Sequence, residues 1–290
     1  MQITDGYLTV KFNTLGAEMQ SLCTNDNQEF LWQAEPSIWP RHAPVLFPMV
    51  GRLKNDQLIH QNKPFSLTQH GFARDSEFAV LDHNHVSIAF VLSSNAASKV
   101  RYPFDFELVI RYTLHEHILF IDYTVRNPST ISLPVSIGAH PAFKWPLAEN
   151  KTKNQHFIQF EKPEQTPVRR LSAGLLLPDS QASPVSLDTL MLSDELFEND
   201  ALIFDQLQSH SLTYGIIDQD YPRLRIRYAD FPHLGLWSKS RANFLCIEPW
   251  QGYASPLAYD GEFSAKPGIV QIPSHAERSW RHSIEIKIAD

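Results

Sequence analysis

Polar and apolar residues alternate one by one along much of this chain, and that period-two pattern restricts the possible folds more than any other feature. The alternation is clearest in four segments, Leu8–Phe12, Phe106–Leu114, Leu224–Tyr228 and Trp280–Ile288. Successive side chains of a β-strand point to opposite faces of the sheet, so each segment is typical of a strand with one buried face and one wet face. The pattern predicts a chain built mainly from β-strands.

The intervals between these segments indicate how the strands are arranged. The sequence contains 20 prolines and 11 glycines, which punctuate the intervals as expected for strands joined by turns and loops. Only Ser186–Phe197 has leucines and a methionine spaced near the helical period, which predicts one short helix. Strands that follow one another without helices between them favour antiparallel sheets packed as a sandwich.

We expect residues 1–290 to form a single domain, because no linker, low-complexity stretch or repeat interrupts the sequence. A length of 290 residues is normal for one large β-sandwich. The segment Glu161–Ser186 is rich in proline. We interpret it as a long excursion on one face of the sandwich rather than as a domain boundary.

Composition and charge exclude several classes of protein. The residues are 43% hydrophobic and 20% charged, as in an ordinary globular protein. The formal net charge of -7 argues against nucleic acid as a partner, because binding it requires a basic surface. No apolar stretch approaches the roughly 20 residues of a membrane span. The N-terminus lacks the basic start and apolar core of a signal peptide, so we expect a cytoplasmic protein that does not enter a membrane.

Four segments interrupt the strand pattern by combining polar, aromatic and turn residues: Arg41–Leu53, Gln69–Asp75, Gly138–Phe143 and Ile247–Gly252. The sequence motifs of dinucleotide, nucleoside triphosphate and serine-hydrolase sites are absent. Two pairs of histidines, His83 with His85 and His115 with His117, share a strand face but bring no third ligand. We therefore predict no metal and no cofactor.

His140 and Glu248 each follow an apolar run and precede a proline. Pro141 restricts the backbone of His140 to an extended conformation and so fixes the direction of its imidazole. A carboxylate at the end of a buried strand is unfavourable unless it is paired or used in chemistry, which makes Glu248 a candidate for catalysis. The alternatives are a packed structural histidine at position 140 and a salt bridge between Glu248 and an arginine.

His70 and Asp200 lie in segments with the character of turns. His70 stands between Gln69 and Gly71, where a surface or hydrogen-bonding role is an equal alternative to catalysis. Asp200 precedes an apolar run and is typical of a turn residue before a strand. Each of these residues taken singly is compatible with a purely structural role.

The four segments, in this order and spacing, resemble the aldose 1-epimerase (galactose mutarotase-like) family, and most closely its LacX-type branch. The features that carry the resemblance are the run from Arg41 to Pro48, the run from Gln69 to Asp75, and the Gly-Ala-His-Pro sequence ending at Pro141. The resemblance extends over nearly the whole chain. It implies an all-β, single-domain antiparallel β-supersandwich with an open sugar-binding cleft.

The resemblance also implies roles for individual residues. The catalytic base of the family corresponds to Glu248, the general acid to His140, and a second active-site histidine to His70. The sugar-binding arginine and aspartate correspond to Arg52 and Asp200. Arg74 has no counterpart in typical members. It can form a structural ion pair with an acid such as Asp75 or contact a negatively charged sugar.

The implied reaction is the interconversion of the α and β anomers of an aldose. A carboxylate and an imidazolium on opposite sides of the sugar would take a proton from the anomeric hydroxyl and give one to the ring oxygen. The aromatic residues Trp39, Phe72, Phe143 and Trp250 are either a platform for the sugar or part of the core.

Two other functions stay open, a hexose-6-phosphate 1-epimerase and a non-catalytic carbohydrate-binding protein. In every case the partner is a small-molecule sugar. We expect the protein to be a monomer or a homodimer.

Overall fold

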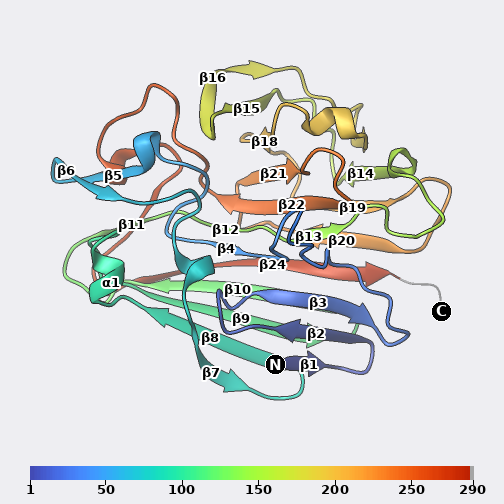
Figure 1. The fold of residues 1–290 in the computed structure, drawn as a ribbon, viewed down its shortest axis with the longest axis horizontal. Coiled ribbons are helices and arrows are strands. Elements are labelled where there is room, and N and C mark those ends of the chain that lie inside the picture. The colour runs from blue at the N-terminus through green and yellow to red at the C-terminus, as the bar shows by residue number, and fades with distance from the viewer. Residues whose placement is uncertain (288–290) are drawn as a thin grey trace.

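The computed structural model describes residues 1–287 and shows two large antiparallel sheets that enclose the main hydrophobic core (Figure 1). The nine-stranded sheet has the strand order β17 (Thr189–Met191), β14 (His156–Phe160), β19 (Ser211–Ile216), β20 (Arg223–Arg227), β24 (Glu277–Lys287), β10 (Ile118–Arg126), β9 (Glu107–His115), β8 (Ser87–Ser93) and β7 (Ala79–His83).

The eight-stranded sheet has the order β16 (Leu175–Gln181), β15 (Val168–Ser172), β18 (Leu202–Phe204), β21 (His233–Trp237), β22 (Phe244–Gln251), β12 (Ile137–Ala139) and β4 (Val45–Leu46), and its remaining strand, β13 (Ala142–Lys144), also pairs with β22. This sheet contributes most of the residues of the candidate site described below.

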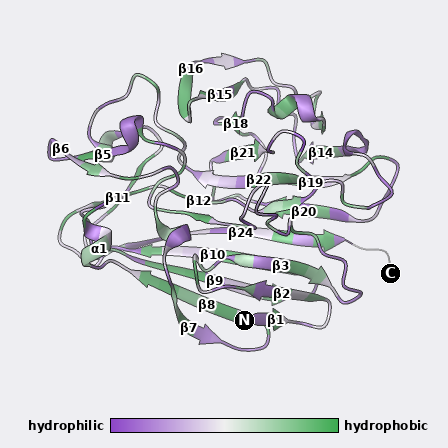
Figure 2. Cartoon of the chain, viewed as in Figure 1, coloured by the Kyte–Doolittle hydropathy of each residue, from purple (hydrophilic) through white to green (hydrophobic). Residues whose placement is uncertain are grey.

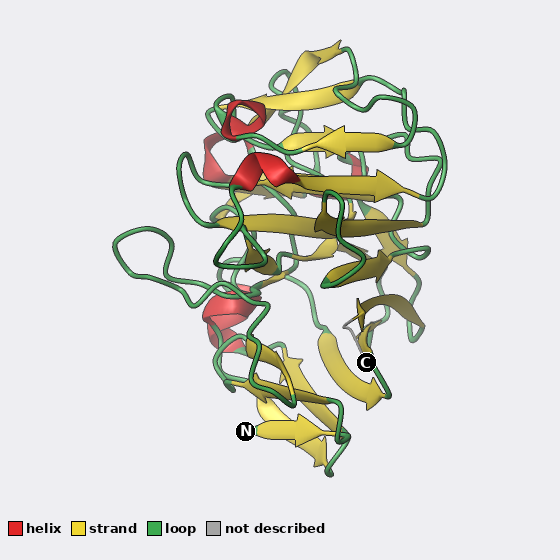
Figure 3. Ribbon diagram, turned by 90° about the vertical axis from the view of Figure 1, so that its right-hand side faces the viewer, coloured by secondary structure: helices red, strands yellow, loops and turns green. Residues whose placement is uncertain are grey.

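Smaller sheets and short helical turns complete the fold (Figure 3). The small sheets are β1 (Gln2–Thr4) with β2 (Leu8–Phe12) and β3 (Met19–Thr24), β5 (Gln57–His60) with β6 (Lys63–Ser66), and β11 (Leu133–Val135) with β23 (Val270–Ile272). The helical elements are α1 (Ala96–Lys99) and the 3₁₀ turns η1 (Lys54–Asp56), η2 (Ala73–Asp75), η3 (Lys153–Gln155), η4 (Asp194–Phe197) and η5 (Phe263–Ala265). No helix within residues 1–287 is long and apolar enough to cross a membrane.

The period-two segments are strands, as predicted. In β9, Leu108, Ile110, Tyr112 and Leu114 are all buried in the core. Figure 2 shows green, hydrophobic residues along the long central strands of this sheet. The predicted segments at Leu8–Phe12 and Leu224–Tyr228 correspond to β2 and β20, and that at Trp280 lies in β24. Ile288, the last residue of the predicted fourth segment, lies outside the described residues.

Strand β22 is buried on both faces, which explains why its first four residues, Phe244–Ile247, are all apolar rather than alternating. Leu245 and Ile247 face the main core between the two sheets. The opposite face of the strand carries Cys246, Glu248 and Trp250, and these side chains are also buried. A polar residue at position 248 therefore lies within the protein.

The predicted helix at Ser186–Phe197 is wrong. The segment forms the edge strand β17 followed by the 3₁₀ turn η4. Leu190 and Leu192 are buried, whereas Met191 between them is half exposed. Leu190 and Leu192 are two residues apart, which is the period of a strand and not of a helix, and backbone pairing with β14 fixes the strand.

The segment Glu161–Ser186 is more regular than the predicted excursion. It contains the hairpin β15–β16, which forms one edge of the eight-stranded sheet. The hairpin turns at Ala173 and Gly174, both of which have positive φ values, of 49° and 79°. Leu176 is the only buried residue of β16. The strand therefore has no alternation of polar and apolar residues from which it could be predicted.

Candidate active site

A cavity of about 340 Å³ lies against the face of the eight-stranded sheet that points away from the main core. Strand residues Ile203, Trp237, Glu248 and Trp250 line it, together with Leu171 from β15. The connecting segments contribute Trp39, His70, Arg74, His140 and Asp200. A cavity of this size falls within the range of small-molecule sites in proteins.

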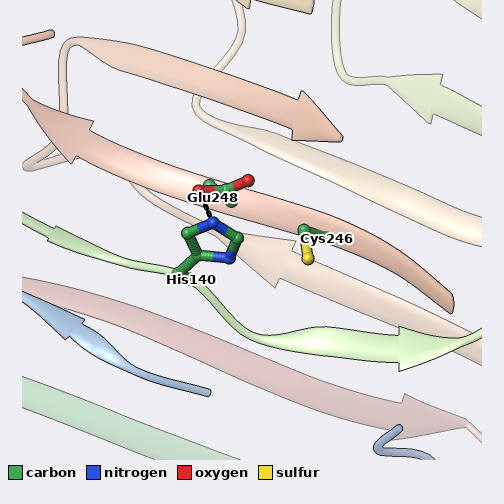
Figure 4. Close-up of side chains that lie close together, drawn as sticks. All are labelled: His140, Cys246 and Glu248. Atoms are coloured by element: carbon green, nitrogen blue, oxygen red, sulfur yellow. Dashed lines mark ion pairs between the residues drawn. The ribbon is translucent and has the colours of Figure 1, made fainter. Parts of the chain in front are cut away.

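His140 faces Glu248 because it links two strands, β12 before it and β13 after it, that both pair with β22. Gly138 of β12 is paired with Trp250, and Ala142 of β13 is paired with Cys246. His140 lies between these two pairs and so lies opposite Glu248. Its Nε2 is 3.1 Å from the Glu248 Oε2 (Figure 4). The two side chains are adjacent on one wall of the cavity, whereas the implied reaction places them on opposite sides of the sugar.

Aromatic rings hold the imidazole of His140 in place. The ring of Trp39 stacks on it with a centroid distance of 5.2 Å, and Trp237 meets it edge-on at 5.7 Å. His140 is 7% exposed and Glu248 1% exposed. The pair is therefore largely shielded from water while both residues still line the cavity.

His70 occupies a tight turn that glycines make possible. Its backbone has a positive φ of 66°, and the following Gly71 has one of 71°. A Cβ on Gly71 would lie 2.2 Å from the carbonyl oxygen of Phe47, so no other residue fits there. This turn directs the His70 ring toward His140, at a centroid distance of 5.6 Å.

The hydrogen bonds of His70 define which nitrogen carries its proton. The Gly51 backbone N–H donates to Nδ1 at 3.1 Å, and the His70 N–H donates to the Gly51 carbonyl at 2.8 Å. An accepting Nδ1 places the proton of the neutral ring on Nε2. The atom 3.2 Å from Nε2 is the side-chain nitrogen of Gln69, which is also a donor, so this tautomer requires the Gln69 amide to turn its oxygen toward His70. His70 is therefore a neutral hydrogen-bond donor in the cavity.

Burial shifts the pKa values of the central pair in opposite directions. It lowers the pKa of His140 to about 3, with a further contribution from the positive charge of Arg74. It raises the pKa of Glu248 well above the usual range, and the carboxylate of Asp200 adds to that rise. Both groups are thus favoured in their uncharged forms, with one proton on Glu248 that His140 can accept.

The three residues expected to bind substrate lie in different environments. Asp200 and Arg74 line the cavity. Asp200 has a positive φ of 66°, and its Oδ1 accepts the Ala201 N–H. Arg52 is absent from the cavity wall formed by the described residues. Its Nε and Nη2 donate to the carboxylate of Asp56 at 2.7 and 2.6 Å, in a bidentate ion pair.

Within residues 1–287, His140, Cys246 and Glu248 are the group of side chains nearest to a metal-ligand set, with their ligand atoms within 4.8 Å of one another. Burial raises the pKa of the Cys246 thiol well above its usual range. A metal would require the thiolate. The environment of Cys246 therefore opposes the form that would bind an ion.

Two of the four aromatic residues considered as a sugar platform line the cavity, Trp39 and Trp250, whereas Phe72 and Phe143 belong to the main core. Sequence reasoning missed Trp237. This residue ends β21, the neighbour of β22, and shares a strand face with Gly235. Its sequence context has no motif, so only the pairing of β21 with β22 could identify it.

The sandwich of two large antiparallel sheets is the fold of the galactose mutarotase-like class of proteins. A family model described as aldose 1-epimerase matches residues 1–268, and the chain belongs to this family. It is 35% identical over 282 residues to the chromosomal protein LacX of Lactococcus lactis subsp. lactis, with 94% of each chain covered.

Solved structures show the same relationship. A galactose mutarotase related enzyme from Lactobacillus acidophilus is 34% identical, with a TM-score of 0.92 and coverage of 99% of this chain and 97% of its own. A galactose mutarotase-like protein from Lactobacillus casei is 28% identical, with a TM-score of 0.92 and coverage of 99% of both chains. The predicted β-supersandwich and family resemblance are confirmed.

Proposed function

We propose that this protein is an aldose 1-epimerase that interconverts α and β anomers with Glu248 and His140 as its acid–base pair. The observation that carries the proposal is the 3.1 Å approach of His140 Nε2 and Glu248 Oε2 on the wall of a cavity large enough for a sugar. Family membership supports the reaction type.

The adjacency of the two groups suits the reaction. The anomeric oxygen and the ring oxygen of a pyranose are bonded to the same carbon, so neighbouring side chains can reach both. Glu248 takes the proton of the anomeric hydroxyl while His140 protonates the ring oxygen. The C1–C2 bond of the open chain then rotates, and the two transfers reverse to close the ring. A positioned acid and base each contribute roughly 10²–10⁴-fold.

The proton must be on His140 before the ring opens. In the free cavity it is favoured on Glu248, because burial disfavours both charged forms. The pair nevertheless holds the required number of protons, one. The facing atoms are 3.1 Å apart, but Glu248 Oε2 makes no hydrogen bond in this arrangement. A small reorientation of the two side chains on sugar binding would align them, and transfer would then convert the neutral pair into carboxylate and imidazolium.

His70 and the tryptophans complete the proposed site. The neutral His70 offers its Nε2–H to a sugar oxygen. Trp39, Trp237 and Trp250 supply apolar surface for the C–H groups of the ring.

The test is the rate of anomer exchange, followed by polarimetry or by NMR exchange spectroscopy, for a panel of aldoses. We expect acceleration over the buffer rate for at least one sugar. Tight binding of a sugar without acceleration of exchange would overturn the proposed epimerase function and favour a non-catalytic carbohydrate-binding protein.

A further inference from the structure

Arg74 is the only lysine or arginine among the described residues that line the cavity. It belongs to the 3₁₀ turn η2, four residues after His70. Its side chain is 18% exposed. Its positive charge contributes to lowering the pKa values of both His70 and His140, so its field extends to the proposed acid–base centre.

The guanidinium of Arg74 has more donors than the protein satisfies. Its Nη2 donates to the carbonyl of Gln69 at 2.8 Å. Its Nε is buried and has no hydrogen-bond partner within residues 1–287, and the nearest acid, Asp75, is 3.8 Å away. A guanidinium carries five N–H donors, and a buried donor without an acceptor is unfavourable. The buried Nε is closed to a ligand, but within residues 1–287 the Nη atoms make only the bond to Gln69, so their remaining N–H groups can meet an acceptor in the cavity.

The charge of Arg74 is also incompletely balanced. Asp75 is shared, because Arg41 Nη2 contacts its Oδ1 at 2.8 Å. Glu18 attracts Arg74, but its Oε1 accepts the backbone N–H groups of His42 and Ala43. Burial, together with repulsion by Arg41, lowers the pKa of Arg74 to about 10. A structural ion pair with Asp75, which is shared with Arg41, therefore does not fully neutralise the positive charge of Arg74.

We propose that Arg74 binds a phosphate or carboxylate group carried by the sugar substrate, so that the protein acts on anionic aldoses. This inference rests on the proposed epimerase function and narrows its substrate class. A guanidinium matches both anions with paired hydrogen bonds. Glu248 does not oppose such a ligand, because its carboxyl group is favoured in the uncharged form.

An anion at Arg74 would also assist the acid. It would offset the positive field that contributes to the lowered pKa of His140. The imidazolium form needed to protonate the ring oxygen would then be easier to reach. Binding of the charged group and catalysis are thereby linked through one residue.

The experiment compares anomer exchange of glucose, glucose 6-phosphate and glucuronate by the wild type and by Arg74→Gln. We expect kcat/KM of the wild type to be at least ~10-fold higher for one of the anionic sugars than for glucose, about 1.4 kcal/mol. Which anionic sugar is preferred distinguishes phosphate from carboxylate. Arg74→Gln should remove most of that preference, measured within each protein as the ratio of kcat/KM for the anionic sugar to kcat/KM for glucose.

Two further variants test the charge argument. Asp75→Asn removes the shared carboxylate and should maintain or increase the preference for the anionic sugar. Arg111→Gln is the matched control, because Arg111 is on β9, is paired with Asp82, and does not line the cavity. It should leave the preference unchanged.

The failure of this inference differs from failure of the epimerase proposal. Rapid exchange of glucose with no anionic preference, unaffected by Arg74→Gln, would retire the anionic substrate and keep the epimerase. If no sugar is turned over, calorimetry with glucose 6-phosphate and glucuronate decides. Binding of either that Arg74→Gln weakens at least ~10-fold would support the anion site without the enzyme, and equal or absent binding would overturn it.

Discussion

The indole of Trp250 occupies the space where a side chain on Gly235 would stand. A Cβ on Gly235 would lie 2.4 Å from Trp250 Cη2, and one on Gly138 would lie 2.5 Å from its Cδ1. Trp250 therefore spans the two strands that flank β22, with its six-membered ring against Gly235 and its five-membered ring against Gly138. These glycines allow a large ring to form part of the cavity wall.

Gly235→Ala should displace Trp250 and weaken sugar binding. Overpacking of this kind costs about 1–3 kcal/mol of stability. Urea unfolding and sugar titration of the variant measure both effects. Gly215→Ala is the control, since its Cβ would meet only the Arg223 and Phe157 side chains at 3.2–3.3 Å, outside the cavity. Unchanged stability and affinity in Gly235→Ala would show that Trp250 is not held as described.

Glu248→Gln should lower kcat by several orders of magnitude, because an amide cannot take the anomeric proton. Sugar affinity should change no more than about tenfold. A fully active, folded Glu248→Gln protein would contradict the assignment of Glu248.

The same variant should be more stable than the wild type at neutral pH. The folded-state pKa of Glu248 lies above the unfolded value of 4.5, so folding loses stability as pH rises from 4.5 through the folded pKa. Removing the titrating group should raise Tm by about 2–4 °C per kcal/mol relieved. The difference in Tm should shrink as pH falls below 4.5. A lower Tm at neutral pH would instead indicate a structural role.

His140→Asn should keep the fold and most of the sugar affinity but lose at least ~10²-fold in kcat. Single-turnover exchange rates and a binding titration on one preparation separate the two properties. His282→Asn is a matched control, because His282 is equally buried but stacks on Tyr123 in the other sheet. It should change stability without changing kcat. Normal turnover by His140→Asn would leave His140 a structural residue.

The pH dependence of kcat/KM, which reports the pKa values of the free enzyme, should show a broad plateau that continues well below pH 6.5. Activity requires one proton on the His140–Glu248 pair, and a second proton binds only near the His140 pKa of about 3. The alkaline limb should lie above the ordinary glutamate range, where Glu248 loses the last proton. A tenfold loss per pH unit beginning at 6.5 would show that His140 titrates as an exposed imidazole.

Chelators should leave the exchange rate unchanged, as should Cys246→Ala. The reason is that the Cys246 thiol is fully buried and its pKa is raised, so it does not favour a metal-binding thiolate. Prolonged dialysis against a chelator, followed by rate measurement, is the test. Loss of activity that a single divalent ion restores would establish a metal centre.

The sequence alone determined the elements whose signal is local. Alternation identified strands such as β9 and β24, because the two-residue period of a strand can be recognised from neighbouring positions in the sequence. The motif segments identified the family and named His140, Glu248 and His70, which the fold brings to one cavity. In Ser186–Phe197 the spacing of the leucines and the methionine favoured a helix, whereas the segment forms an edge strand and a 3₁₀ turn.

Only the tertiary structure decided which groups surround each candidate site residue. The pairing of β12 and β13 with β22 sets His140 against Glu248. Asp56 holds Arg52 beyond the cavity wall, whereas Arg74 lies on it. The opposite pKa shifts of His140 and Glu248 arise from burial by residues distant in the chain. Such relationships depend on strand register and on solvent exclusion, which are long-range properties that adjacent residues do not encode.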